Sequence, residues 1–161
     1  MAALCTIVFD GKRLSGPEGE PLVDFLKQRG SELPHVCYHP SLGALETCDA
    51  CWVEVDGELK RGCTLKSAEG LRVDSRSEHA RAAREEGMDR LLAKHELYCT
   101  VCENNNGDCT LHNTMVDMQI PIQRYEFQRK PHEKDTSSPF YTYDPDQCIL
   151  CGRCVEACQN V

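Results

Sequence analysis

The chain has 161 residues, enough for one or two small domains. Its 26 acidic residues outnumber its 18 basic residues, which argues against a nucleic-acid partner because such partners select for basic patches. No apolar run approaches the roughly 20 residues that cross a bilayer, and the apolar residues 1–9 lack the basic region and cleavage site of a signal peptide. We therefore expect a cytoplasmic protein without a membrane span.

The first 75 residues carry the signals of a small α+β unit. Residues 4–9 are rich in strand formers and are closed by an Asp-Gly turn. Apolar residues at helical spacing predict a helix over 22–26, with Gly30 at its C-terminal end. Residues 52–61 alternate around a second Asp-Gly turn and predict a hairpin, and residues 71–73 predict a further strand. Together these elements indicate a small mixed sheet crossed by one helix.

A longer helix is expected to follow. Ser75 and Glu78 have the spacing of a capping box that opens a helix. Gly87 weakens this helix by about 1 kcal/mol relative to alanine. Residues 121–139 are polar and contain three prolines, which predicts a connection on the surface. The apolar face of the helix is predicted to contain Ala80, Ala83, Gly87, Met88, Leu91, Leu92 and His95.

Twelve cysteines require an explanation. A secreted disulfide scaffold is the minor alternative, since such scaffolds are shorter and carry an export signal. Without that signal the thiols should be reduced, and reduced cysteines spaced two apart usually hold metal. Eleven of the twelve fall into three ligand sets, and the remaining Cys5 lies among apolar strand residues and is assigned to the core.

The first ligand set consists of four cysteines, with a tight C-x2-C turn in the middle and one cysteine on each side. Such an arrangement can close a tetrathiolate around a [2Fe–2S] cluster, as a related spacing does in plant-type ferredoxins. A structural zinc site with four cysteine ligands is the alternative that the spacing leaves open. The four residues are Cys37, Cys48, Cys51 and Cys63.

The second set combines one histidine with three cysteines: His95, Cys99, Cys102 and Cys109. Four such ligands can fill the iron sites of a [4Fe–4S] cubane, and His95 and Cys99 would share a helical face if the preceding helix continued through residue 98. An imidazole in place of a thiolate should raise the potential of the cluster, as it does in Rieske centres. A zinc site remains an alternative. His112, three residues after Cys109, is the rival fourth ligand.

The third set is the C-x2-C-x2-C-x3-C run of bacterial [4Fe–4S] ferredoxins, formed by Cys148, Cys151, Cys154 and Cys158. Gly152 gives this loop room to wrap a cubane. In two-cluster ferredoxins the fourth cysteine of such a run ligates the other cluster. We therefore expect Cys158 to ligate a neighbouring [4Fe–4S] cluster. A second run is absent from the 161 residues, which predicts a domain that continues beyond them.

Two segments of the chain resemble a known family. The run Pro-His-Val-Cys-Tyr-His-Pro at residues 34–40, and Cys-Asp-Ala-Cys-Trp-Val-Glu-Val at 48–55, resemble the N-terminal ferredoxin domain of three relatives. These are the large iron–sulfur subunit of respiratory complex I, the [FeFe] hydrogenases, and the molybdenum- or tungsten-dependent formate dehydrogenases. All share the order of a [2Fe–2S] β-grasp domain, a [4Fe–4S] segment with one histidine ligand, and further ferredoxin-type ligands.

Two other segments favour the formate dehydrogenases. The spacing of six residues between Cys102 and Cys109 resembles that group, whereas complex I and hydrogenase members typically have five. Residues 143–154 also resemble the formate dehydrogenase version. The resemblance implies the catalytic (alpha) subunit of a cytoplasmic formate dehydrogenase that is NAD-linked or quinone-linked.

The resemblance also implies that catalysis and electron transfer take place in different parts of the protein. Formate would be oxidised at a molybdenum or tungsten bis(molybdopterin guanine dinucleotide) in a domain outside these residues, so no residue here is nominated as catalytic. The partners would be the remainder of the catalytic subunit and an electron acceptor. The same module in an [FeFe] hydrogenase or a complex I-type enzyme is the alternative. The implied domains are a β-grasp domain at 1–76, a [4Fe–4S] segment at 77–119, a linker at 120–143, and the start of a ferredoxin-type domain at 144–161.

Overall fold

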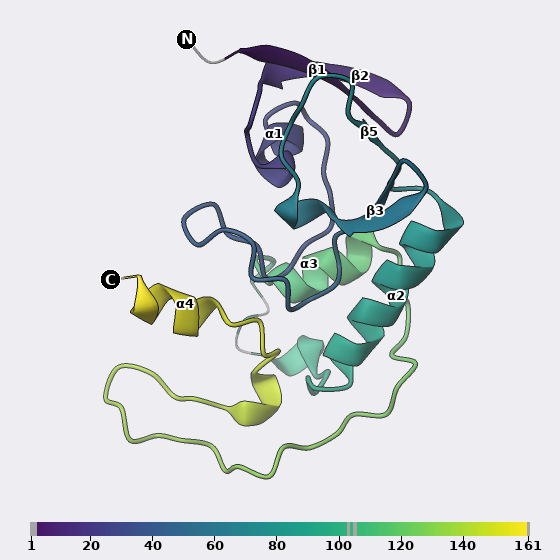
Figure 1. The fold of residues 1–161 in the computed structure, drawn as a ribbon. Helices are drawn as coiled ribbons and strands as arrows, with labels where there is room; N and C mark the ends of the chain where they lie inside the picture. Colours follow the sequence, from purple (N-terminus) through teal and green to yellow (C-terminus); the bar gives the residue numbers. More distant parts are fainter. Residues whose placement is uncertain (1–2, 103, 105, 161) are drawn as a thin grey trace.

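The computed structural model describes residues 3–102, 104 and 106–160. It confirms the α+β class, with the strands in the first half of the chain and most of the helical residues in the second (Figure 1). None of the helices in this described part is long and apolar enough to cross a membrane.

The N-terminal sheet is mixed, with the strand order β2-β1-β5. Strand β1 (Leu4–Phe9) pairs antiparallel with β2 (Lys12–Pro17) and parallel with β5 (Arg72–Val73). The turn between β1 and β2 places Asp10 at φ 49° and Gly11 at φ 82°, the left-handed values that a tight two-residue hairpin needs. The strand over 4–9 and the later strand near 71–73 are thus confirmed.

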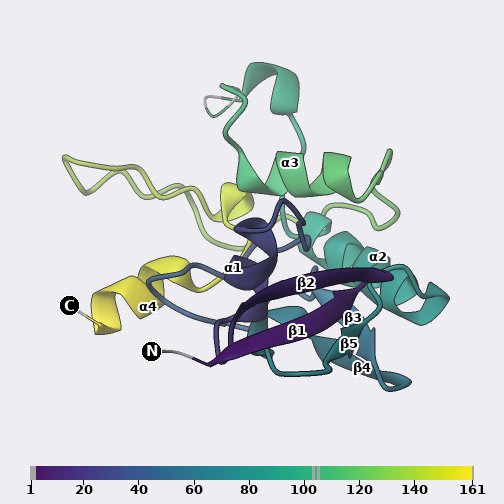
Figure 2. The ribbon, with the colours of Figure 1, turned by 90° about the horizontal axis from the view of Figure 1, so that it is seen from above.

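Helix α1 (Leu22–Lys27) packs against this sheet (Figure 2). It is short because the chain turns out of it through Gln28, and Gly30 follows at φ 68°, a conformation that glycine adopts without strain. The apolar side of α1 is buried against strand residues such as Ile7 and Phe9. The residues of α1 that are buried are Leu22, Val23, Phe25 and Leu26.

The expected hairpin is present as β3 (Trp52–Val55) and β4 (Glu58–Arg61), followed by the 3-10 turn η1 (Gly62–Thr64). It forms a two-stranded sheet of its own, whereas a single mixed sheet was expected. An isolated bridge between Glu54 and Asp74 connects it to the chain that leaves β5. The hairpin therefore lies beside the first sheet and presents its open end to the cysteine loops.

Helix α2 (Glu78–Leu92) confirms the long helix, but the expected capping box is wrong. The cap is Ser77, whose hydroxyl accepts a hydrogen bond from the Ala80 N–H at 3.1 Å. The Ser75 hydroxyl instead donates to Asp10 at 2.7 Å, so it serves the first hairpin. Both serines suit an N-cap by composition, and the tertiary contact of Ser75 decides between them.

The C-terminal end of α2 corrects a second expectation. The helix ends at Leu92, and Ala93 is its C-cap. His95 lies beyond the helix, and a separate 3-10 turn η2 (Cys99–Val101) begins four residues later. His95 and Cys99 therefore do not share a helical face, and whatever brings them together must be a tertiary contact.

Three short helical elements complete the chain: α3 (Thr110–Asp117), the 3-10 turn η3 (Pro145–Gln147) and α4 (Arg153–Gln159). Between α3 and η3 the chain runs over the surface without a helix or strand, as expected (Figure 1). This connection is nevertheless tied down, because the Gln128 N–H donates to the Ala93 carbonyl at 2.9 Å.

The buried residues form two apolar clusters. One lies between the N-terminal sheet, α1 and the hairpin. The other, the junction core, lies among α2, α3 and the cysteine loops, and we define it by Val36, Cys37, Cys48, Ala50, Met88, Leu91, Leu92 and Leu111. Cys109 and Cys151 pack against the junction core, so residues from all three ligand sets meet there.

Gly87 is where α2 touches the first cysteine loop. A Cβ at this position would lie 2.6 Å from the Asp49 Cβ and 2.9 Å from the Asp49 carbonyl oxygen, closer than real Cβ atoms approach. Glycine at this position therefore lowers the helix propensity of α2 but allows the loop to pack closely against it.

We expect Gly87→Ala to destabilise the protein by about 1–3 kcal/mol, the usual cost of overpacking. Thermal unfolding of the variant measures the loss. Ala82→Gly, on the exposed side of the same helix, is the control and should cost about 1 kcal/mol from helix propensity alone. An unchanged or increased stability of Gly87→Ala would refute the close-approach explanation, because alanine is the better helix former.

Candidate functional site

The four cysteines of the first set are buried around the open end of the β3–β4 hairpin, each 4% exposed or less. Cys51 directly precedes β3, and Cys63 lies in η1 just after β4. The Gly62 N–H donates to the Cys51 carbonyl at 2.8 Å, so the hairpin pairing extends to the two cysteines. Cys37 and Cys48 approach from the loop that precedes the hairpin, and both belong to the junction core.

The thiols of this set are arranged as two pairs. Interaction with the Cys48 thiol lowers the pKa of Cys37, whereas interaction with Cys37 and burial raise the pKa of Cys48. Interaction with Cys63 and burial likewise raise the pKa of Cys51. A [2Fe–2S] cluster needs two thiolates on each of its two irons, and this donor set fits such a cluster.

Asp49 anchors the C-x2-C turn between the two pairs. Its backbone is left-handed at φ 53°, a conformation that Asp tolerates better than most residues. Its carboxylate accepts from Arg61 at 2.8 Å and from Arg90 at 3.0 Å, and Arg61 also lies over the Trp52 ring. Two cations therefore sit beside a site that would carry negative charge when loaded.

The second set lines one cavity of about 850 Å³. His95, Cys99, Cys102 and Cys109 all contribute to its wall, and so does the rival ligand His112. The expected ligands are thus brought to one cavity although no helix joins them. Among the described residues, no three His, Cys, Asp or Glu side chains gather closely enough to ligate a single metal ion.

The orientation of His95 suits a metal ligand. Its Nδ1 lies 3.1 Å from the Gln147 carbonyl oxygen, an acceptor that fixes the proton on Nδ1 and leaves Nε2 free. Burial lowers the pKa of His95, and the nearby Lys130 ammonium acts in the same direction. The ring is therefore neutral at physiological pH, as coordination requires.

The third set is divided between the cavity and the surface. Cys148 and Cys151 line the same cavity as the second set, whereas Cys154 and Cys158 lie exposed on α4. The residues on both sides of Cys151 have a left-handed backbone conformation, with Leu150 at φ 56° and Gly152 at φ 78°. Tight bends of this kind form the amide nests that surround iron–sulfur clusters, so the loop fits a cubane.

Hydrogen bonds join the loops that carry the first and third sets. The Arg153 guanidinium donates to the Tyr38 carbonyl at 2.6 Å and to the Cys37 carbonyl at 3.3 Å. The Thr47 hydroxyl donates to the Cys151 carbonyl at 3.0 Å. Sequence reasoning did not identify Arg153 or Thr47, and no local signal could have done so, because their partners lie more than 100 residues away.

Comparisons with known families match each of these regions. Residues 2–78 match the "2Fe-2S iron-sulfur cluster binding domain". Residues 84–124 match the "NADH-ubiquinone oxidoreductase-G iron-sulfur binding region", and residues 141–161 match the "4Fe-4S binding domain". The chain is an iron–sulfur protein. It has one [2Fe–2S] and two [4Fe–4S] binding regions.

Individual relatives of this iron–sulfur protein agree with the family matches. It is 51% identical over its whole length to the probable oxidoreductase YjgC of Bacillus subtilis. It is also 46% identical, over 96% of its length, to the protein named "Putative formate dehydrogenase" in Staphylococcus haemolyticus. The chain spans 16% of the length of each of these two relatives. It therefore corresponds to the iron–sulfur region of larger oxidoreductases.

A solved structure has the same fold. The NAD+-reducing [NiFe]-hydrogenase in its H2-reduced state superposes with a TM-score of 0.86 at 29% identity. The match covers 97% of this chain and 66% of the hydrogenase chain. The arrangement of all three regions, and not only of the ferredoxin-like sheet, is therefore similar to that of a redox enzyme.

Proposed function

We propose that the chain is the electron-transfer region of a formate dehydrogenase. Electrons from formate would arrive from a molybdenum or tungsten bis(molybdopterin guanine dinucleotide) domain outside these residues and leave for an NAD-linked or quinone-linked acceptor. The observation that carries this proposal is the junction core, where residues of all three ligand sets pack together. Ligand sets that pack into one core would hold their clusters near one another, as electron transfer requires.

The proposed ligands of the [2Fe–2S] cluster are Cys37, Cys48, Cys51 and Cys63, in a domain of the β-grasp type spanning residues 1–76. The match of residues 2–78 to the "2Fe-2S iron-sulfur cluster binding domain" supports two irons over one zinc, since the four thiols would supply two ligands to each iron. Both thiol pairs are buried, which protects a cluster from solvent.

For the segment 77–119 we propose a [4Fe–4S] cluster held by His95, Cys99, Cys102 and Cys109. The common cavity and the fixed orientation of the His95 ring support this assignment. Cys109 lies at the start of α3, where the His112 N–H approaches its sulfur at 3.5 Å. His112 shares the cavity, but among the described residues no carbonyl contact comparable to that of His95 is found for its ring.

The segment 120–143 would be a linker, and 144–161 the start of a ferredoxin-type domain. Cys148, Cys151 and Cys154 would supply three ligands of a second [4Fe–4S] cluster, with the fourth from elsewhere in the larger protein. Cys158 would ligate a neighbouring cluster. The left-handed residues on both sides of Cys151 support a loop that wraps a cluster.

In this proposal the chain moves electrons and performs no bond chemistry, so none of its residues is assigned a catalytic role. Its partners would be the remainder of the catalytic subunit and the acceptor, in the cytoplasm. The hydrogen bonds among the three ligand-bearing segments would fix the distances between the proposed clusters.

The same module in a hydrogenase or a complex I-type enzyme is the second candidate. The likeness to the NAD+-reducing hydrogenase and the match to the NADH-ubiquinone oxidoreductase-G region favour it. The six-residue spacing before Cys109 and the relatives named as formate dehydrogenases favour formate.

The reductant distinguishes the candidates. The native full-length protein is purified without oxygen, and formate, NADH or hydrogen is added to separate samples while EPR records the reduced clusters. Reduction by formate within the enzyme's turnover time supports the proposal. Reduction by hydrogen or NADH but not by formate would overturn it.

We expect His95→Cys to lower the midpoint potential of the second cluster, because a thiolate adds one negative charge where the imidazole adds none. An EPR-monitored redox titration measures the shift. His112→Cys is the matched control and should leave the potential unchanged. A shift in the His112 variant alone would transfer the ligand role to His112.

A further inference from the structure

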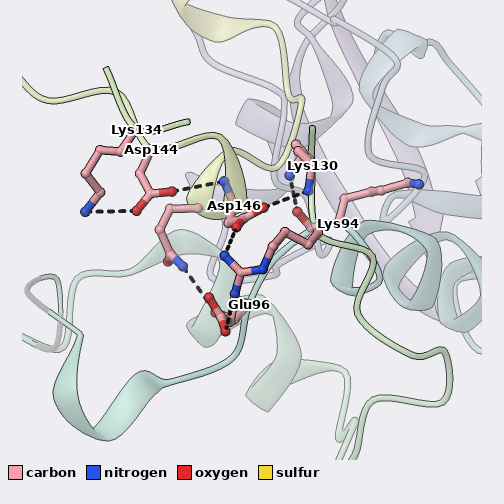
Figure 3. A network of polar contacts seen from close by, with 8 residues as sticks. Lys94, Glu96, Lys130, Lys134, Asp144 and Asp146 are labelled. Carbon is pink, nitrogen blue, oxygen red and sulfur yellow. Dashed lines mark hydrogen bonds and ion pairs between the residues drawn. The ribbon is translucent and has the colours of Figure 1, made fainter. Parts of the chain in front are cut away.

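Lys130 lies where the backbones of the second and third ligand sets meet. Its ammonium donates to the Cys148 carbonyl at 2.9 Å. It also donates to the Lys94 carbonyl (Figure 3). Lys94 immediately precedes His95 in the sequence, and Cys148 belongs to the third set. One positive charge is thus bonded to the backbone beside a proposed ligand of each [4Fe–4S] cluster.

Lys130 is also held in place through its backbone. The carboxylate of the buried residue Asp146 accepts from the Lys130 N–H at 2.9 Å and from Arg129 at 2.7 Å. The Asp146 carbonyl in turn accepts from the Glu96 N–H at 3.1 Å. Figure 3 shows these groups as one connected network around Lys130 and Asp146.

The same network fixes the imidazole of His95. Gln147 lies between Asp146 and Cys148, and its carbonyl accepts from His95 Nδ1. The Gln147 side chain reaches back to the Glu96 carbonyl at 3.4 Å. The segment around His95 and the segment around Cys148 are therefore joined by several hydrogen bonds in addition to those of the Lys130 ammonium.

We propose that Lys130 is a positioning residue shared by two [4Fe–4S] clusters, and that its charge raises the midpoint potential of both. This inference rests on the proposed function. A reduced cluster carries one more negative charge than an oxidised cluster, and a nearby half-buried cation stabilises the more negative state. Asp146 does not cancel the effect at the ammonium, since Arg129 forms an ion pair with that carboxylate.

The test is Lys130→Met in the full-length protein, with both [4Fe–4S] midpoints measured by dithionite titration under EPR. Both midpoints should fall, and the [2Fe–2S] midpoint should stay at the wild-type value. Lys12→Met is the control, because Lys12 is exposed on β2 and lies outside the ligand-bearing loops. This control removes the same charge away from the proposed [4Fe–4S] sites and should leave all midpoints unchanged.

Lys130→Arg keeps the charge and should return both midpoints toward the wild-type values. If Lys130→Met loses iron and Lys130→Arg retains it, the positioning role is supported. Unchanged midpoints in a fully loaded Lys130→Met, an equal shift in Lys12→Met, or loss of iron from both Lys130 variants would overturn the inference. Because dithionite supplies the electrons, these results do not depend on whether formate is the substrate.

Discussion

Cys51→Ala is expected to abolish the [2Fe–2S] cluster and to leave the [4Fe–4S] clusters in place. Cys51 is 1% exposed, pairs with Cys63 and continues into β3, so no neighbouring thiol or water can replace its sulfur. An iron with three ligands in a buried site is not retained. The [2Fe–2S] contribution to the visible absorption of the oxidised protein should disappear, and so should the EPR signal of the reduced [2Fe–2S] cluster. The iron content should fall by two atoms per chain.

Cys5→Ala is the matched control. Cys5 is 2% exposed in β1, and its thiol lies 3.7 Å from the Pro17 carbonyl, away from all three ligand sets. Loss of this small buried side chain should cost stability without changing the iron content. A Cys51→Ala variant that keeps the [2Fe–2S] signal, or a Cys5→Ala variant that loses it, would contradict the proposed ligand set.

Arg153→Met is expected to free the third cysteine loop from the first. The guanidinium donates to two carbonyls of the first loop, and hydrogen bonds to a charged group contribute about 1.5–3 kcal/mol each. Because Arg153 is half-buried, we expect a loss at the low end of the sum, about 3 kcal/mol, which should speed amide exchange in residues 148–158 on the order of 100-fold. Hydrogen–deuterium exchange of the loaded protein measures this change.

Arg81→Met provides the comparison for Arg153. Arg81 is exposed on α2, and its replacement removes the same charge without touching either loop. Exchange in residues 148–158 should then match the wild-type protein. If Arg153→Met also leaves exchange in this segment unchanged, the contact with the first loop contributes no stability, and the third loop is held by the junction core alone.

The parts of the fold that were predicted from the sequence depend on local signals. Two Asp-Gly turns located the hairpins because few other residue pairs adopt the left-handed backbone there. Cysteine spacing located the three ligand sets, because a metal cluster needs several donors within a short length of chain. Gly30 marked the end of α1 for the same conformational reason.

The parts that could not be predicted depend on contacts between distant segments. Ser75 and Ser77 are equally good caps, and only the bond from Ser75 to Asp10 assigns the cap to Ser77. The end of α2 at Leu92 gives no glycine or proline signal. Gly87 looked like a weak point of the helix, whereas its lack of a side chain is what admits Asp49.

The relation among the three ligand sets also had to come from the structure. Arg153 and Thr47 join the first set to the third, and Gln147 and Lys130 join the third to the second. These residues stand at no motif position that marks such a role. Their partners are brought near by the junction core, which no local sequence pattern encodes.

The most direct test of the central claim is to measure iron, acid-labile sulfide and zinc in the anaerobically purified protein, together with its visible spectrum. The proposed clusters predict a brown protein that contains iron and sulfide, lacks stoichiometric zinc and bleaches on addition of dithionite. A colourless protein with zinc bound to its cysteines, unaffected by dithionite, would contradict an electron-transfer role.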